Sequence, residues 1–127
     1  DVERIVSYLK KGQTTNDYPP ALSSLFNKDL QPFMINWMQY NPTDEIKKLN
    51  IPILVINGTK DLQVPISEAE LLAKSNSKST LTIIEDMNHV LFEIKGDELE
   101  NSKSYNESFR PLSDELVEAM VTFINSL

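Results

Sequence analysis

Apolar residues recur with helical spacing along the first forty residues of the chain. A helix is predicted over residues 2–10, because apolar side chains fall there at positions i, i+3, i+4 and i+7 (Val2, Ile5, Val6 and Leu9). Pro19-Pro20 favours a shorter second helix that ends at Phe26, since proline is tolerated in a first helical turn. A third helix follows, with Asp29 as its expected N-cap. We therefore predict that residues 1–40 form a helical segment.

The third helix carries a broad aromatic and methionine face. Its apolar positions are Leu30, Phe33, Met34, Trp37 and Met38. Such a face at helical spacing is typical of a buried core. A lid that faces a substrate is the alternative interpretation, and the pattern alone does not decide between the two.

From residue 41 onward the pattern alternates between strand and helix. Asn41-Pro42 ends the third helix, and Thr43 is expected to cap a short turn. The run from Ile51 to Ile56 is continuously apolar and rich in β-branched residues, which suits a strand buried on both faces of a parallel sheet. The next helix is expected at Ser67, where Glu70 completes a capping-box pattern.

A second strand over Thr80–Glu85 and a final helix after Pro111 complete the pattern. Residues 93–110 are polar and acidic, so a long exposed loop is expected there. Ser113 suits the start of the final helix, whose apolar face is predicted to hold Leu116, Met120, Phe123 and Leu127. Two strands joined by a helix must be parallel, with a right-handed crossover. The sequence therefore predicts an α/β fold, in which residues 41–127 form one end of a larger sheet.

Composition and charge exclude several classes of function. Apolar residues make up 40% of the chain and charged residues 24%, as in ordinary globular domains. A formal net charge of −7 disfavours binding to nucleic acid or to an anionic membrane, and no apolar run is long enough to cross a bilayer. With no cysteine and one histidine, the chain offers neither disulfides nor a His-rich or thiolate metal site. No cofactor or metal is therefore expected.

Two polar residues follow the two predicted strands. Asp61 lies in the loop after the first strand, and His89 lies just after the second. Adjacent parallel strands end at the same edge of a sheet, which is where functional groups gather in open α/β folds. An aspartate that accepts from imidazole Nδ1–H fixes the tautomer needed for general base catalysis. The alternatives are a turn or cap role for Asp61 and a packing role for His89.

Two segments that contain these residues resemble the α/β-hydrolase superfamily. They are residues 51–65 (IPILVINGTKDLQVP) and 84–91 (IEDMNHVL), which are similar to the last two strand-end segments of such enzymes. There a buried strand is followed by Gly-x-x-Asp-x-x-Val-Pro and, about 25–30 residues later, by a catalytic histidine. The separation here is 28 residues. With residues 41–49 (NPTDEIKKL), the chain most resembles bacterial carboxylesterases of the esterase D type.

The resemblance implies a partial α/β-hydrolase fold, made of the last two parallel strands plus flanking helices and preceded by a cap or lid over residues 1–40. It implies that Asp61 is the acid and His89 the base of a catalytic triad. It also implies a small carboxylic ester as substrate, with the cap face bordering its pocket. The residues of that face are Phe33, Met34, Trp37 and Met38.

A nucleophile is missing from this pattern. The chain has three glycines, Gly12, Gly58 and Gly96, and no Gly-x-Ser-x-Gly elbow. Because the resemblance implies the order Ser, Asp, His, we expect the nucleophile before residue 1, and we expect the chain to be an inactive C-terminal part of a longer hydrolase. The alternative is a non-catalytic interaction or dimerisation module. With one neighbouring strand absent, the strand at 51–57 is expected to pair with a second copy and form a homo-oligomer.

Overall fold

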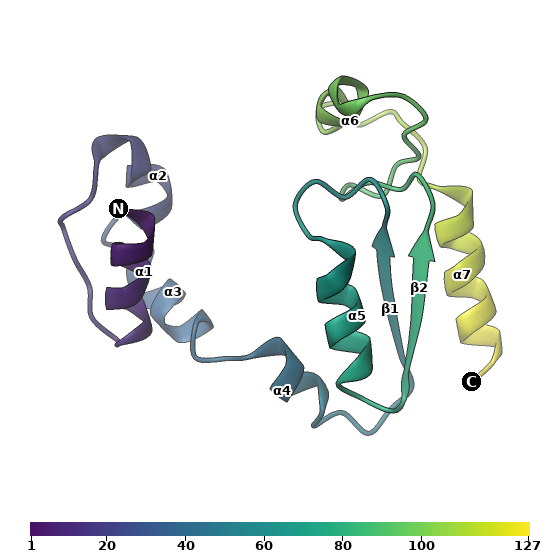
Figure 1. Ribbon diagram of the computed structural model, residues 1–127, viewed down its shortest axis with the longest axis horizontal. Helices are drawn as coiled ribbons and strands as arrows, with labels where there is room; N and C mark the ends of the chain where they lie inside the picture. The colour runs from purple at the N-terminus through teal and green to yellow at the C-terminus, as the bar shows by residue number, and fades with distance from the viewer. The chain divides into compact units, whose positions relative to one another are not determined.

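Two units follow one another along the chain in the computed structural model, which describes residues 1–127 (Figure 1). The first unit is Asp1–Glu45 and the second is Ile46–Leu127. The boundary lies a few residues beyond position 40, where the sequence pattern changes. Each unit has its own core, and each is described by itself.

The first unit is helical. Its elements are α1 (Val2–Lys10), the 3₁₀ turn η1 (Pro20–Leu22), α2 (Ser23–Phe26) and α3 (Gln31–Trp37). Its core consists of Ile5, Leu9 and Phe26, against which partly buried apolar side chains pack. The helix predicted over residues 2–10 is therefore confirmed, and its apolar spacing is what faces this core.

A buried glutamine ties the loop of residues 11–19 to α3. The side chain of Gln31 is fully buried, and its amide nitrogen Nε2 donates to the carbonyl oxygens of Thr15 and Phe26, both at 2.7 Å. Its Oε1 accepts from the Thr15 amide at 2.8 Å. The side-chain amide of Gln31 thus supplies hydrogen-bond partners to backbone groups of a loop that lies outside the helices.

Asp29 does not cap α3, contrary to the sequence prediction. Oδ1 of Asn27 instead accepts from the amides of Asp29 and Leu30, both at 3.1 Å, and the N-cap position itself falls on Leu30. The short turn α4 (Pro42–Ile46) shows the same shift, because Asn41 Oδ1 accepts from the amide of Thr43 at 3.1 Å. Asparagine readily forms such Asx turns. The sequence pattern therefore does not show whether Asn27 or Asp29 caps the start of α3, nor whether Asn41 or Thr43 caps the start of α4.

The second unit is an α/β layer. Strands β1 (Ile53–Gly58) and β2 (Ser79–Ile84) are parallel, with Ile53 opposite Ser79 and Gly58 opposite Ile84. The crossover helix α5 (Ile66–Lys74) and the final helix α7 (Asp114–Asn125) lie on opposite sides of this pair (Figure 1). The predicted α/β class, with two parallel strands and flanking helices, is confirmed.

The two faces of the strand pair are buried separately. On one face Val55 packs with Ala69 of α5 and with Ile46. On the other, Ile84 packs with Leu116 of α7, and the neighbouring Ile56 is partly buried against them. Because successive side chains of a strand alternate between faces, the continuous apolar run of β1 supplies both cores.

Two local predictions in the second unit are wrong, and one apolar face is only partly buried. Residues 93–110 are not an exposed loop, because they contain helix α6 (Glu98–Ser104), in which Asn101 and Ser104 are buried. Ser67 does not cap α5, whose N-cap is Pro65 without a side-chain bond. The apolar face of α7 is mostly exposed, since only Leu116 is buried, whereas these residues are exposed: Val117, Met120, Val121, Ile124 and Leu127.

The start of α7 agrees with its prediction. Ser113 is the N-cap, and its Oγ accepts from the amide of Leu116 at 3.4 Å. None of the helices is both long enough and apolar enough to cross a bilayer.

Candidate functional site

The loops after β1 and β2 meet at the carboxyl ends of the two strands. The amide of Thr59 donates to the carbonyl oxygen of Ile84 at 3.0 Å, and that of Lys60 donates to Met87 at 2.9 Å. A Cβ at Gly58 would lie 1.9 Å from the carbonyl oxygen of Met87, so only glycine allows this approach. The parallel pairing thus continues past the strands and brings the two loops together.

Asp61 and His89 are in direct contact at this edge. Oδ2 of Asp61 lies 3.0 Å from Nδ1 of His89. The aspartate side chain is 8% exposed and the imidazole 37% exposed. The contact uses Nδ1, so the imidazole meets Asp61 through one ring nitrogen and Nε2 is the other.

The second carboxylate oxygen of Asp61 is held by its own loop. Oδ1 accepts from the amides of Gln63 at 2.8 Å and Val64 at 2.9 Å. Burial acts to raise the pKa of Asp61, but the hydrogen bonds from Val64, Gln63 and His89 outweigh it, so the pKa is lowered. The carboxylate is therefore ionised at neutral pH and fixed in orientation by bonds to both oxygens.

His89 occupies a tight turn of unusual backbone geometry. The amide of Leu91 donates to the carbonyl oxygen of Asn88 at 3.0 Å, and Leu91 has a φ of 69°. A leucine in this left-handed region is strained, and such strain persists only where surrounding contacts enforce it. Here the carbonyl oxygen of Leu91 accepts from the amide of Ser113 at 2.9 Å, which ties the turn to the start of α7.

A buried polar cluster lies under both loops. It consists of Asn88, Asn101 and Ser104, which are all 2% exposed or less. The sequence interpretation assigned no role to Asn88 and missed the other two, because they lie in a stretch that looked like solvated loop. The signals that were available are Asp97, which caps α6 by accepting from the amides of Leu99 and Glu100, and the i, i+3 spacing of Asn101 and Ser104.

A hollow of about 250 Å³ opens beside the Asp61–His89 pair. Its lining is apolar apart from the pair and two asparagines, and comprises Ile56, Asn57, Gly58, Asp61, Val64, Met87, Asn88, His89 and Leu91. Oδ1 of Asn57 is buried without a hydrogen-bond partner, while its Nδ2 donates to the carbonyl oxygen of Val64 at 3.3 Å. Asn57 thus holds the Asp61 loop from the strand side.

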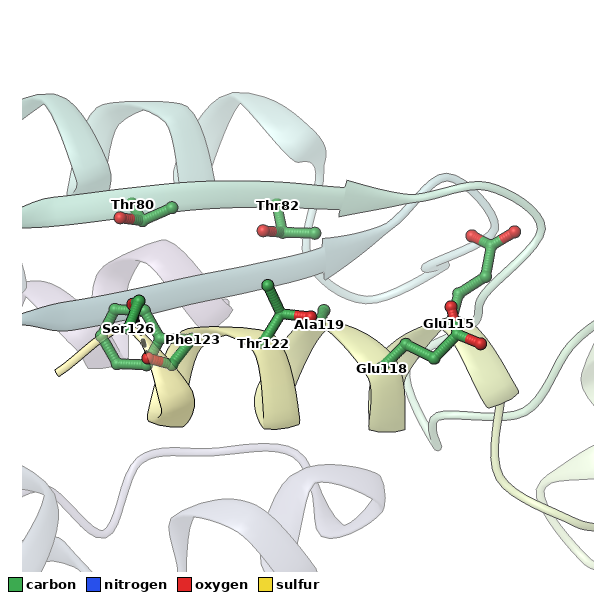
Figure 2. Close-up of a pocket in the computed structure, with 8 residues that line it drawn as sticks. All are labelled: Thr80, Thr82, Glu115, Glu118, Ala119, Thr122, Phe123 and Ser126. Carbon is green, nitrogen blue, oxygen red and sulfur yellow. Dashed lines mark hydrogen bonds between the residues drawn. The ribbon is translucent and has the colours of Figure 1, made fainter.

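A larger groove of about 400 Å³ lies between β2 and α7 and contains neither member of the pair (Figure 2). Figure 2 shows Thr80 and Thr82 of β2 on one side of it and α7, with the residue that follows it, on the other. The groove is the larger hollow, but it brings together no nucleophile–base or acid–base pair. The candidate site is therefore the Asp61–His89 pair at the strand ends.

The aromatic and methionine face of α3 is divided by the fold. Phe33 and Trp37 are 65% and 67% exposed, and their ring centroids are 6.0 Å apart. Met34 and Met38 instead pack against the core of the first unit. Core packing thus describes the two methionines, and the two aromatic rings are left on the surface.

No group of three or more His, Asp or Glu side chains is placed to hold a metal ion. Among the hydrogen bonds of the structure, none joins a serine hydroxyl to His89.

The chain matches no protein-family model and no curated protein. Among solved structures it is similar to the crystal structure of a serine hydrolase involved in carbazole degradation, the CarC enzyme. The identity is 20% and the TM-score 0.38, over 87% of this chain and 48% of that enzyme. The chain thus spans about half the length of that structure.

Proposed function

We propose that this chain supplies the aspartate and histidine of a Ser-His-Asp triad to a hydrolase that cleaves carboxylic esters. The observation that carries the proposal is the 3.0 Å contact between Asp61 Oδ2 and His89 Nδ1 at the carboxyl ends of two parallel strands. The resemblance of residues 51–65 and 84–91 to the α/β-hydrolase superfamily supports the same assignment, and the resemblance of residues 41–49 to esterase D-type enzymes supports a carboxylic ester as substrate.

The geometry suits general base catalysis by His89. When Nδ1–H donates to the ionised Asp61, the lone pair of the neutral imidazole is on Nε2. Nε2 takes the proton of an attacking serine hydroxyl and later gives it to the leaving alcohol. Asp61 stabilises the imidazolium that forms between the two steps, and its lowered pKa keeps it ionised for that purpose.

The nucleophile and the oxyanion donors are proposed to come from outside these residues. No Gly-x-Ser-x-Gly elbow occurs in the sequence, and no serine of the chain hydrogen-bonds to His89. The chain alone is therefore expected to be inactive. In the same proposal residues 1–40 serve as the cap, and its face of Phe33, Met34, Trp37 and Met38 borders the ester substrate in the longer enzyme.

Activity-based labelling tests the proposal. The purified 127-residue chain should show no stoichiometric labelling by a fluorophosphonate and no hydrolysis of p-nitrophenyl esters above background. The polypeptide extended by the coding region upstream of Asp1 should be labelled at one serine and should hydrolyse these esters. In the extended protein, His89→Ala and Asp61→Asn should each lower kcat on the order of 10⁴-fold, as for triad members in general.

Asn76→Ala is a matched control in the extended protein, because Asn76 is a buried side chain at the opposite ends of the same strands. It should destabilise the fold and leave the kcat of the remaining folded enzyme unchanged. A fully active His89→Ala variant would contradict the proposal, as would stoichiometric labelling of the short chain.

A non-catalytic interaction module is the second candidate function, and the free edge of β1 favours it. The sheet has only two strands, so β1 pairs with β2 on one edge and has no strand on the other. An apolar, uncharged edge is a template for another strand. A second copy would pair with it about a two-fold axis, to give a four-stranded sheet.

Light scattering distinguishes these states for the chain of 127 residues. We expect a homodimer or larger species at micromolar concentration. Val55→Lys in β1 does not test pairing through the free edge, because Val55 is buried. Proline at Leu54, whose amide faces the free edge of β1, is the sharper variant, compared with proline at Leu81, whose amide faces the free edge of β2. A folded wild-type monomer would contradict self-association through β1.

A further inference from the structure

One buried amide of α6 touches both loops of the Asp61–His89 pair. Nδ2 of Asn101 donates to the carbonyl oxygen of Lys60 at 2.7 Å, and Oδ1 accepts from Nδ2 of Asn88 at 3.0 Å. Lys60 and Asn88 are the residues immediately before Asp61 and His89. A single side chain therefore bridges the two positions that adjoin the functional pair.

The side chain of Asn88, the residue before His89, has hydrogen-bond partners at both its nitrogen and its oxygen. Its Nδ2 also donates to Oγ of Ser104 at 2.8 Å, and its Oδ1 accepts from the amide of Phe92 at 3.0 Å. Oγ of Ser104 in turn donates to the carbonyl oxygen of Asn101 at 2.7 Å. Every side-chain nitrogen and oxygen of Asn88, Asn101 and Ser104 therefore has a partner, and such a buried network is rigid because rotation of a side chain breaks its hydrogen bonds.

Helix α6 is itself fixed by charged contacts outside this network. Glu100 accepts from Nη1 of Arg110 at 2.7 Å and from the amide of Gly96 at 2.6 Å. Arg110 also contacts Glu107, with 2.8 Å between Nη2 and Oε2. The hydrogen bonds from Arg110 and from the Gly96 backbone amide lower the pKa of Glu100, so this carboxylate stays ionised beside Arg110. The helix thus offers Asn101 a fixed support.

We propose that Asn101 is a positioning residue that sets the orientation of His89 relative to Asp61. The backbone bond from Lys60 to Met87, at 2.9 Å, keeps the two loops close without it. What Asn101 adds is a fixed direction for the Lys60 carbonyl and for the Asn88 side chain, and hence for the residues that follow each. The inference rests on the proposed catalytic role of the pair, but it concerns the placement of the pair and not the reaction.

NMR of the imidazole ring tests this placement directly. His89 is the only histidine of the chain, so its ring signals are assigned without ambiguity. At alkaline pH, where imidazoles are neutral, the ¹⁵N shifts of the two ring nitrogens report the tautomer. The wild-type chain should show the Nδ1–H tautomer with a slowly exchanging Nδ1 proton. Asn101→Ala should lose that proton signal and show a mixture of tautomers, while the strand amides keep their dispersed signals.

Asn76→Ala is the matched control. Asn76 is also a buried asparagine, and its Nδ2 donates to the carbonyl oxygens of Ile46 at 2.6 Å and Leu49 at 3.0 Å, at the other end of the strands. It should lower the urea midpoint as Asn101→Ala does and leave the His89 tautomer unchanged. A folded Asn101→Ala chain with the wild-type tautomer and proton exchange would overturn the proposal.

Asn101→Ser covers the case in which the alanine variant does not fold, because its hydroxyl leaves one polar group in the buried position. The serine side chain is too short to reach both Lys60 and Asn88, so the tautomer should again become mixed, and an unchanged tautomer overturns the proposal. Labelling of the extended protein is a separate readout. A mixed tautomer in Asn101→Ala together with an unlabelled extended protein would support the positioning role and contradict the hydrolase.

Discussion

The two units of this chain bury polar side chains in different ways. The first unit, Asp1–Glu45, buries one polar side chain, Gln31, and that side chain connects a loop to a helix that follows it closely in the sequence. The second unit, Ile46–Leu127, buries six, and several of them join segments far apart in the sequence. Those six are Asn57, Asn76, Asn88, Asn101, Ser104 and Ser113.

The units also differ in what they leave on the surface. The first exposes four aromatic rings, those of Tyr8, Phe33, Trp37 and Tyr40. The second exposes the free edge of β1 and much of the apolar face of α7. A buried hydrogen-bond network fixes the orientation of the side chains in and next to it. An exposed apolar surface favours contact with another molecule and needs no such network. We therefore expect the buried polar network of the second unit to fix the orientation of Asp61 and His89, and the exposed apolar surfaces of both units to be covered by other atoms.

Substitution of Gly58, which has no room for a side chain, should have the largest effect on the second unit, and Gly12 in the first unit is the comparison. Gly58→Ala would place a Cβ 1.9 Å from the Met87 carbonyl oxygen, so the strand-end loops must separate, and we expect a loss of about 3 kcal/mol. Gly12→Ala meets open space and only opposes a φ of +74°, so we expect about 1 kcal/mol. Urea unfolding followed by amide NMR signals of each unit measures both.

Gly58→Ala should also mix the His89 tautomers, which Gly12→Ala should not do. Equal losses of stability from the two substitutions would show that close packing at the strand ends is not what distinguishes the second unit.

Removal of the buried glutamine should affect the first unit alone. Gln31→Ala leaves the Thr15 amide and two carbonyl oxygens without their partner, so we expect a loss of about 2 kcal/mol. Trp37, the only tryptophan, lies at the end of α3 and reports unfolding of this unit by fluorescence. Gln13→Ala, at an exposed position, is the control. A shift of the β-strand amide signals equal to the fluorescence shift would mean that the units unfold together.

Acid should destabilise the second unit partly through Asp61. Because its pKa is lowered on folding, its carboxylate stabilises the fold above the ordinary value of 3.8, and this contribution is lost as the pH falls through the folded pKa. Urea midpoints of wild type and Asp61→Asn should therefore differ most at neutral pH and converge in acid. Glu3→Gln, at an exposed position of α1, controls for removal of a carboxylate. A constant difference at every pH would contradict the assignment.

The exposed ring of Trp37 should contribute least to stability. Trp37→Ala removes a side chain that is 67% exposed, so the free energy of unfolding should change within about 0.5 kcal/mol. Phe26→Ala, in the core of the same unit, should lose about 3–5 kcal/mol. Urea unfolding followed by far-UV circular dichroism compares the two variants.

The same Trp37→Ala substitution in the extended protein should alter its preference among esters of different acyl length, because the ring is proposed to border the substrate. An unaltered preference together with an unaltered stability would leave the aromatic face without a role in recognition.

Much of the fold follows from periodicity along the chain. The spacing of apolar residues predicts α1 and α7, and the β-branched runs predict β1 and β2 to within two residues. The strand–helix–strand order requires a parallel pair, and parallel strands end at one edge. That is enough to expect Asp61 and His89 at the same edge, where the structure brings them to 3.0 Å. These features depend on local pattern and chain connection, which the sequence contains.

The tertiary structure alone decided what supports and what covers these elements. Helix α6 is polar except for Leu99, and its buried Asn101 is held by hydrogen bonds with residues 13 and 41 positions away, a relation that leaves no period in the sequence. The pattern of α3 likewise shows which residues are apolar, but not that Met34 turns to the core while Trp37 stays outside. Amphipathic spacing reports that a face is to be covered, and only the packing of distant segments determines which atoms cover it.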